Sequence, residues 1–551
     1  MNTQRCETAN SILGEHFSQE RYGTIMNMSS IRIIILTSIL LLAGCQQVEQ
    51  PSSDTITIRL IHDKVRNTVS TSSTNVGDLL SEQGLELGPL DRTLPSQSTL
   101  LTNGMDVTII RVEEELQNEE IVIPFEKQVV RNDGLPVGES RLLQTGTSGL
   151  EQITYRIVKE DGNVTSKTIL RRTMMEKPID EIIMVGSQAT YTIVPIEGSL
   201  AYISSGNAWI MSKSSGIRQP LTVNGLLDGR IFQLSNNSRY LLYSSKPNQE
   251  ADLKETFNEL WVVDTNTANS EPLTLNVQNV LWAAWSPKDQ FSIAYSTGEP
   301  RTTAPGWQAH NNLHIATFNE TDIEVVHTTI IEPSAGGSYG WYGMQFAWAP
   351  DGIHIAYAQA DRIGIIDLSK PTDPVKKQLT NFSHYQTWTD WVWIPALTWS
   401  PDSKFIYTVS HGDPIGLELP EDSQIFNVGA LAKDGSFQAT LAERTGMWSN
   451  PVVSPITNDG FQVAYLQSNN PLQSVNSGYT LSVMEQDGSN AKFIFPTSGE
   501  TALKPQNVTW SPNGEQIALI HRGNLWVVDN ESLVSQQLTS DSQTSKPSWA
   551  K

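Results

Sequence analysis

The chain has 551 residues, 38% hydrophobic and 17% charged, a composition typical of a folded protein with about two to four domains rather than a disordered or membrane-embedded one. Its formal net charge of −22 argues against a nucleic-acid partner, because phosphate binding requires clustered lysines and arginines. The two cysteines, Cys6 and Cys45, both precede the predicted folded region, so we expect neither disulfides nor a thiolate zinc site within it.

The N-terminal region contains a candidate export signal. The apolar run over 33–44 has twelve residues and is shorter than the roughly twenty that span a membrane, so it fits the apolar part of a signal peptide. It ends in Leu-Ala-Gly-Cys over 42–45, which resembles the lipobox of bacterial lipoproteins. The resemblance implies that Cys45 is lipidated and anchors the protein to a membrane. A plain secretory signal is the alternative.

We therefore predict that residues 1–45 form an N-terminal extension with a lipoprotein signal peptide. The short polar segment over 46–54 is expected to be a tether between the lipid and the first domain.

Residues 55–112 are predicted to form a small α+β module. Alternation of apolar and polar residues predicts a β-hairpin over 55–70. A short helix is expected from a cap at Thr74 or Asn75 to a stop at Gly84, followed by a strand over 107–112. This order is that of a ubiquitin-like fold. The block resembles the modules that precede the G5 domain in resuscitation-promoting factors and related cell-wall proteins.

Residues 113–187 carry spaced glycines between strand-like segments and end in the run Pro-Ile-Asp-Glu-Ile-Ile over 178–183. Glycines at such positions allow positive φ angles or close approach of backbones in a thin sheet. The block resembles a G5 domain, which implies an extended β-rich module with little interior. Two roles stay open for it, a spacer or a contact with cell-wall glycan.

The remaining residues, 198–551, repeat a pattern roughly every fifty residues. A Trp-Ser-Pro-Asp-Gly-like turn is followed by an alternating strand, a strand that ends in Asp and a terminal Leu-Thr. Four strands per repeat are typical of β-propeller blades. The pattern resembles TolB-type and related WD40-like propellers. The repeat tryptophans are expected to pack between neighbouring blades: Trp285, Trp348, Trp399 and Trp510.

The two ends of this region predict how the ring closes. Residues 201–204 match a second strand with no first strand before them, and residues 547–551 match a first strand with nothing after it. Joined, they complete one blade. We therefore predict a mainly β protein whose seven-bladed propeller is closed by its C-terminal strand. Six blades is the alternative, if a degenerate repeat has been misread.

No catalytic constellation is evident in the sequence. There is no Gly-x-Ser-x-Gly motif, and His310 and His314 lack the glutamate and helical context of a metal site. The innermost strands are expected to bring apolar and small residues to the channel. We therefore predict a protein that is not an enzyme and has no cofactor and no metal.

Long insertions at 297–311, 332–345, 381–395 and 409–424 are predicted to share one face of the propeller. Loops are usually polar, so aromatic residues in them require an explanation. Two interpretations of these aromatic residues stay open. They form a recognition surface for a sugar or a protein partner, or they pack against one another within the loops. The candidate binding residues are Trp307, Tyr339, Trp341, Tyr342, Tyr385, Trp388, Trp391 and Trp393.

These observations predict an exported, lipid-anchored binding or scaffold protein of the cell envelope. Its expected partners are the membrane, through the lipid on Cys45, and a cell-wall glycan or an envelope protein. The alternative is an enzyme or regulator of peptidoglycan remodelling, because resuscitation-promoting factors combine similar modules with a wall-cleaving domain. Here the propeller occupies that domain's place.

Overall fold

The computed structural model describes residues 55–187, 193–247, 255–267, 270–319, 324–457 and 460–551. The described residues form two compact units, one with the residues up to 116 and 156–168, the other with 117–155 and 169–551. The predicted signal peptide, Cys45 and the tether lie outside the described residues.

The N-terminal module is a four-stranded sheet packed on one helix, with strand order β2-β1-β4-β3. Its core includes the fully buried Ile58, Leu79 and Val107. Asn75 caps the helix by accepting a hydrogen bond from the Asp78 N–H at 2.9 Å. The predicted hairpin, helix and late strand are confirmed. The elements are β1 (Ile56–His62), β2 (Val65–Thr71), α1 (Val76–Glu82), β3 (Arg92–Leu94) and β4 (Asp106–Ile110).

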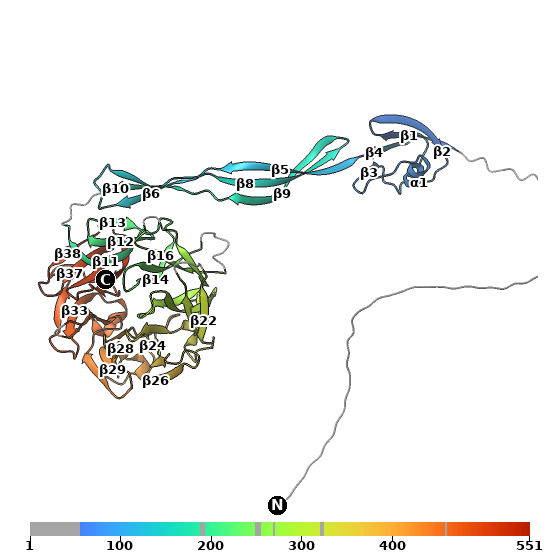
Figure 1. Cartoon of the computed structure of the whole chain (residues 1–551). Coiled ribbons are helices and arrows are strands. Elements are labelled where there is room, and N and C mark those ends of the chain that lie inside the picture. The colour runs from blue at the N-terminus through green and yellow to red at the C-terminus, as the bar shows by residue number, and fades with distance from the viewer. Residues whose placement is uncertain (1–54, 188–192, 248–254, 268–269, 320–323, 458–459) are drawn as a thin grey trace, which may run out of the picture. The chain divides into compact units, whose positions relative to one another are not determined.

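The next block forms two three-stranded sheets, with orders β5-β8-β9 and β6-β10-β7 (Figure 1). Nearly every side chain of β5 and β9 is exposed, so this block has little interior, as predicted. Backbones approach closely at Gly186, where a Cβ would overlap the Pro136 carbonyl oxygen. The strands are β5 (Val112–Ile123), β6 (Lys127–Asn132), β7 (Ser140–Gln144), β8 (Gly149–Glu160), β9 (Asn163–Glu176) and β10 (Glu181–Gly186).

The described residues of 195–551 form seven consecutive antiparallel sheets, each of four main strands; the third sheet also carries the short strand β20. Figure 1 shows these sheets arranged around a common axis. The first sheet contains β11 (Pro195–Ser204), β12 (Asn207–Ser214), β13 (Arg218–Pro220) and β39 (Thr544–Ala550). The second and third contain β14 (Leu227–Leu234), β15 (Tyr240–Ser245), β16 (Glu259–Asp264), β17 (Leu273–Gln278), then β18 (Val280–Trp285), β19 (Ser292–Pro300), β20 (Trp307–Ala309), β21 (Leu313–Thr317) and β22 (Val326–Ile331).

The other four sheets follow in chain order. The fourth and fifth contain β23 (Gln345–Trp348), β24 (His354–Gln359), β25 (Arg362–Asp367), β26 (Val375–Asn381), then β27 (Leu397–Trp399), β28 (Phe405–His411), β29 (Phe426–Ala432) and β30 (Gln438–Ala442). The sixth and seventh contain β31 (Val452–Val453), β32 (Gln462–Ser468), β33 (Tyr479–Glu485), β34 (Lys492–Phe495), then β35 (Thr509–Trp510), β36 (Gln516–His521), β37 (Asn524–Asp529) and β38 (Ser535–Gln537).

The C-terminal strand closes the first sheet. β39 pairs antiparallel with β11, with Leu200 opposite Trp549 and Ser204 opposite Thr544, which confirms the predicted pairing of the two ends. The first strand of each sheet contacts the first strand of the next in the order β39, β14, β18, β23, β27, β31, β35 and back to β39. These contacts form a closed circuit, so no first strand is left without a neighbour on either side.

Three repeat tryptophans join neighbouring sheets as predicted. The indole N–H groups of Trp285, Trp399 and Trp510 each donate, at 3.0 Å, to a carbonyl on the first strand of the preceding sheet. Trp348 departs from this pattern. Its Nε1 is buried and has no hydrogen-bond partner within the described residues.

Candidate functional site

The four long insertions lie where the sequence predicted them, between β19 and β21, β22 and β23, β26 and β27, and β28 and β29. Each of them contacts the next, beginning with the Asn311 amide, which donates to the Ser334 carbonyl at 3.2 Å. The Tyr339 ring lies 4.9 Å from the His384 ring, and the Gln386 backbone N–H donates to the Glu421 carbonyl at 2.8 Å. These loops therefore form one continuous surface on adjacent sheets.

Two of the candidate binding residues lie inside this surface rather than on it. Tyr385 and Trp393 are buried and contact the Phe426 ring at centroid distances of 5.2 and 4.9 Å. The Trp393 indole N–H donates to the Met447 carbonyl at 3.0 Å. A loop this long needs apolar residues to hold it together, so these two form its core. For them the self-packing interpretation is the correct one.

The other loop aromatics are exposed or half-buried. Trp388 is 77% exposed and has a φ of 56°, a strained conformation for a bulky residue. Trp341 is 38% exposed and lies under the Arg301 guanidinium at 5.6 Å. Trp391 stacks on Trp448 at 5.8 Å. We call these residues the aromatic rim: Tyr339, Trp341, Tyr342, Trp388 and Trp391.

The remaining candidate, Trp307, lies on the strand 307–309, which contacts the rim segment 340–342, and it lines a cavity of about 1170 Å³. The first strands of four successive sheets supply most of the other lining residues, so this cavity occupies the axis of the ring. A second cavity of about 840 Å³ adjoins it and shares Arg230, Phe232, Asn507 and Lys546 with it. We call the two cavities together the channel.

The channel carries charged side chains that the sequence analysis did not anticipate. Arg230 on β14 stacks on the Trp307 ring at 4.4 Å, and desolvation lowers the pKa of its guanidinium. Desolvation also lowers the pKa of Lys546 on β39. The expectation of an apolar channel, which was based on strands such as 282–285, is therefore wrong for this side of the axis. The sequence signal that could have predicted a charged channel is the presence of a charged residue, such as Arg230, in the first strand of a repeat.

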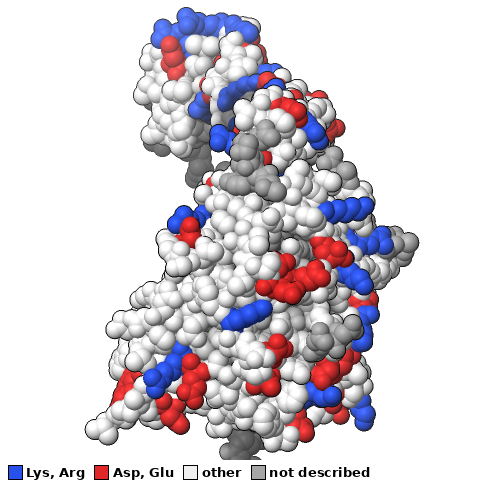
Figure 2. Space-filling view, turned by 90° about the vertical axis from the view of Figure 1, so that its left-hand side faces the viewer, with Lys and Arg blue, Asp and Glu red and all other residues white. Residues whose placement is uncertain are grey.

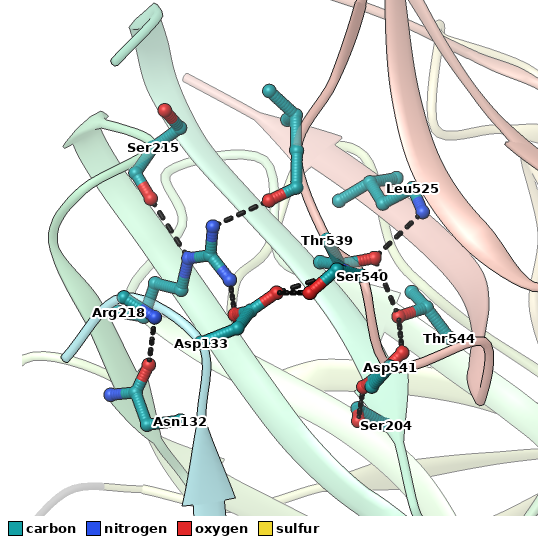
Figure 3. Close-up of polar contacts among 12 residues, drawn as sticks. Asn132, Asp133, Ser204, Ser215, Arg218, Leu525, Thr539, Ser540, Asp541 and Thr544 are labelled. Carbon is teal, nitrogen blue, oxygen red and sulfur yellow. Dashed lines mark hydrogen bonds and ion pairs between the residues drawn. The ribbon is translucent and has the colours of Figure 1, made fainter. Parts of the chain in front are cut away.

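A second buried charged cluster joins the distal end of the G5-like block to the first sheet (Figure 3). Asp133 forms an ion pair with Arg218, whose side chain is 5% exposed, and accepts a hydrogen bond from the Ser540 backbone N–H at 2.9 Å. Leu135 and Met184 are buried in one apolar cluster with Trp549 of β39. We call this contact the junction. The charges of Asp133 and Arg218 are paired with each other there.

Within the described residues, no three His, Cys, Asp or Glu side chains gather as metal ligands would, and no helix is long and apolar enough to cross a membrane. On the face shown in Figure 2, acidic and basic side chains are interspersed. This mixed face contrasts with the channel, whose described lining residues include more cations than carboxylates.

Three family models match parts of the chain: the G5 domain over residues 114–188, the G5-linked ubiquitin-like domain over 62–98, and the dipeptidyl peptidase IV N-terminal region over 462–548. The chain contains a G5 domain and a G5-linked ubiquitin-like domain. The third match falls on the sixth and seventh sheets and the closing strand.

Resuscitation-promoting factor RpfB from Mycolicibacterium smegmatis is 21% identical over 155 residues, which are 27% of this chain and 43% of that protein. The chain therefore spans less than half the length of this relative. Among solved structures, a TolB candidate from Agrobacterium tumefaciens is 14% identical, with a TM-score of 0.34 and coverage of 58% of this chain and 96% of that one. The tricorn protease is 12% identical, with a TM-score of 0.40 and coverage of 75% and 43%.

Proposed function

We propose that this chain is an exported binding or scaffold protein associated with the cell wall. The observation that carries the proposal is the combination, in one chain, of the two G5-related domains with a ring of sheets that presents an aromatic rim. A relative that is similar over 155 residues is named a resuscitation-promoting factor, and this name together with the G5 domain supports an extracellular, cell-wall-associated role. Lipidation at Cys45 would hold the protein to a membrane.

Within this proposal the chain has three parts. Residues 55–112 are the ubiquitin-like module, 113–187 the G5 domain, and 198–551 a seven-bladed β-propeller. The seven sheets, the cyclic contacts of their first strands and the pairing of β11 with β39 support this blade count. The G5 domain acts as a spacer that also contacts wall glycan, and the propeller recognises a glycan or protein partner.

The rim is the proposed recognition surface. Trp388 and Trp341 expose large apolar rings, and such rings stack on sugar faces or anchor protein partners. The strained backbone at Trp388 supports a binding role, because strain of this kind persists where function requires a side chain to be presented.

The test is co-sedimentation of the full chain with purified peptidoglycan, comparing wild type with the W341A/W388A double variant. We expect the double variant to sediment at least about fivefold less, since loss of a single exposed aromatic anchor already costs about 1 kcal/mol. The control is Phe493→Ala, which removes an aromatic residue of β34 that is 49% exposed and lies outside the rim. Equal sedimentation of all three proteins would reject the rim.

An enzyme or regulator of peptidoglycan remodelling is the second candidate. It is favoured by the match of residues 462–548 to the N-terminal region of dipeptidyl peptidase IV. Release of soluble fragments from labelled peptidoglycan separates the two candidates. The binding proposal expects sedimentation without release, whereas release by the full chain would support the second candidate.

A further inference from the structure

We propose that the channel binds an oxyanion, a carboxylate or a phosphate group of a larger ligand, between Arg230 and Lys546. This site is separate from the aromatic rim and does not depend on the function proposed for it. The ligand class follows from the charges and the size of the channel.

The two cations come from neighbouring first strands. Arg230 lies on β14 and Lys546 on β39, and these strands contact each other. The Lys546 side chain passes close to Gly229, where a Cβ would lie 3.7 Å from Lys546 Cγ and 3.8 Å from Cε. These are ordinary van der Waals distances, so the lysine side chain runs along β14 beside Arg230. The fold therefore brings two positive charges to the same wall.

Neither cation is paired with a carboxylate within the described residues. The Arg230 guanidinium lies over the rings of Trp307 at 4.4 Å and Phe257 at 5.5 Å, and no ion pair within 4.0 Å is formed there by Arg230 or Lys546. Aromatic rings fix the position of a guanidinium but do not neutralise it. Both groups thus stay available to an anion.

The nearby carboxylate, Asp228, is engaged in holding the local backbone. It accepts hydrogen bonds from the Arg230 backbone N–H at 3.0 Å, from the Ser244 hydroxyl and from the Asn258 amide at 2.9 Å. Among the described lining residues it stands against five cations: Arg230, Lys246, Lys504, Arg522 and Lys546. Of these, Arg522 pairs with Glu500 at 3.2 Å.

This excess of positive charge is unusual in a chain with a formal net charge of −22. Placing like charges together in a partly desolvated cavity costs free energy unless an opposite charge joins them. Desolvation is the largest cause of the lowered pKa of Lys546; the nearby Asp228 carboxylate raises this pKa, and Arg230 has a smaller effect that lowers it. An oxyanion between the two would offset both effects, because it attracts each cation and accepts their hydrogen bonds.

Two tryptophans of the channel wall differ from the other repeat tryptophans in their indole donors. Trp307 and Trp348 both line the larger cavity, and the Nε1 atom of each is buried with no partner within the described residues. Trp285, Trp399 and Trp510 satisfy the same group through the preceding sheet. Both donors are covered by neighbouring atoms, so the anion site rests on the two cations and not on these indoles.

The size of the channel sets the scale of the ligand. Cavities of about 1170 and 840 Å³ exceed what a lone phosphate or acetate fills and match the space that organic ligands occupy. The oxyanion is therefore one group of a larger molecule, such as an acidic sugar or a peptide carboxylate.

The test is titration of the full chain with inorganic phosphate and, separately, with glucuronate, followed by calorimetry and by tryptophan fluorescence. We expect saturable binding of at least one probe, weakened about tenfold or more in Arg230→Gln and in Lys546→Gln. The matched control is Lys376→Gln. This lysine lies on β26, outside the channel, with its ammonium group 4.3 Å from the Tyr357 ring, so the variant should bind the probes as wild type does.

The outcomes separate the two sources of the anion. Saturation by phosphate alone assigns a phosphate ligand, saturation by glucuronate alone a carboxylate, and saturation by both an oxyanion site of either kind. Absence of saturable binding, or equal binding by all variants, overturns the proposal. Should Arg230→Gln fail to fold, Lys546→Gln decides alone, since that side chain lies on the cavity surface. None of these results bears on peptidoglycan sedimentation through the rim.

Discussion

Arg218 and Arg230 lie on neighbouring sheets, and both are partly withdrawn from water, yet their surroundings differ. At the junction, Arg218 meets Asp133 and donates to the Leu538 carbonyl, and Asp133 in turn accepts from Ser540. In the channel, Arg230 stacks on Trp307 without a carboxylate partner within the described residues. The first arrangement completes its interactions inside the chain, as a structural contact does. The second leaves the Arg230 charge available to a ligand from outside the chain.

Removing the closing strand should break the junction and the channel together. A chain that stops before Thr544 loses β39, and with it the pairing to β11, the buried Trp549 and Lys546. The exposed edge of β11 would promote aggregation. We expect the cooperative unfolding transition to disappear in a urea titration monitored by tryptophan fluorescence, which reports on this region because all 15 tryptophans lie in 209–549. A retained transition of normal size would contradict the closure.

At the junction, Asp133→Ala should destabilise the protein by about 3 kcal/mol, because it leaves the buried Arg218 charge without its partner. The measurement is the free energy of unfolding from urea titration. The double variant D133A/R218M should recover part of the loss, since replacing both charges removes the unpaired one. A loss below about 1 kcal/mol in the single variant would show that the ion pair is solvated.

In the channel, the corresponding change should have a much smaller effect on stability. Arg230→Gln removes a desolvated charge and its stacking on Trp307, two effects of opposite sign, so the free energy of unfolding should change by less than about 1 kcal/mol. The same urea titration checks it. If this variant lost as much as Asp133→Ala, Arg230 would be a structural residue and the contrast with Arg218 would fail.

The smallest expected effect concerns pH. Desolvation lowers the pKa of Lys546, so its positive charge is present at low pH and is lost, as pH rises, earlier than for an ordinary lysine. Affinity for the anion should therefore decline as pH increases from neutral towards the usual lysine range. Calorimetric titration across this range measures it, and Lys546→Gln should flatten the profile. An unchanged profile in that variant would assign the pH dependence to another group.

Much of the architecture was predictable from residue patterns alone. Alternating strands, the glycine spacing of the G5 block, the repeated Trp-Ser-Pro turns and the unmatched strands at 201–204 and 547–551 are local signals. These signals indicate which face of a strand is apolar and where the chain turns. For the same reason the positions of the long aromatic loops followed from the repeat.

What each loop residue does was decided only by tertiary packing. Tyr385 and Trp388 are three positions apart in one aromatic loop, yet one is buried against Phe426 and the other is 77% exposed. Irregular loops have no periodicity from which a buried face can be read.

The same limit applies to the charged residues. Arg218 and Asp133 are 85 positions apart in the sequence, and Arg230 and Lys546 are 316 apart, so neither pair leaves a local pattern. The sequence by itself determined the two G5-related domains, the strands and the pairing of the two ends in the first sheet. Only the folded ring decided that one arginine finds its carboxylate at the junction while the other faces an open channel, because burial and charge pairing depend on neighbours that the chain brings together from a distance.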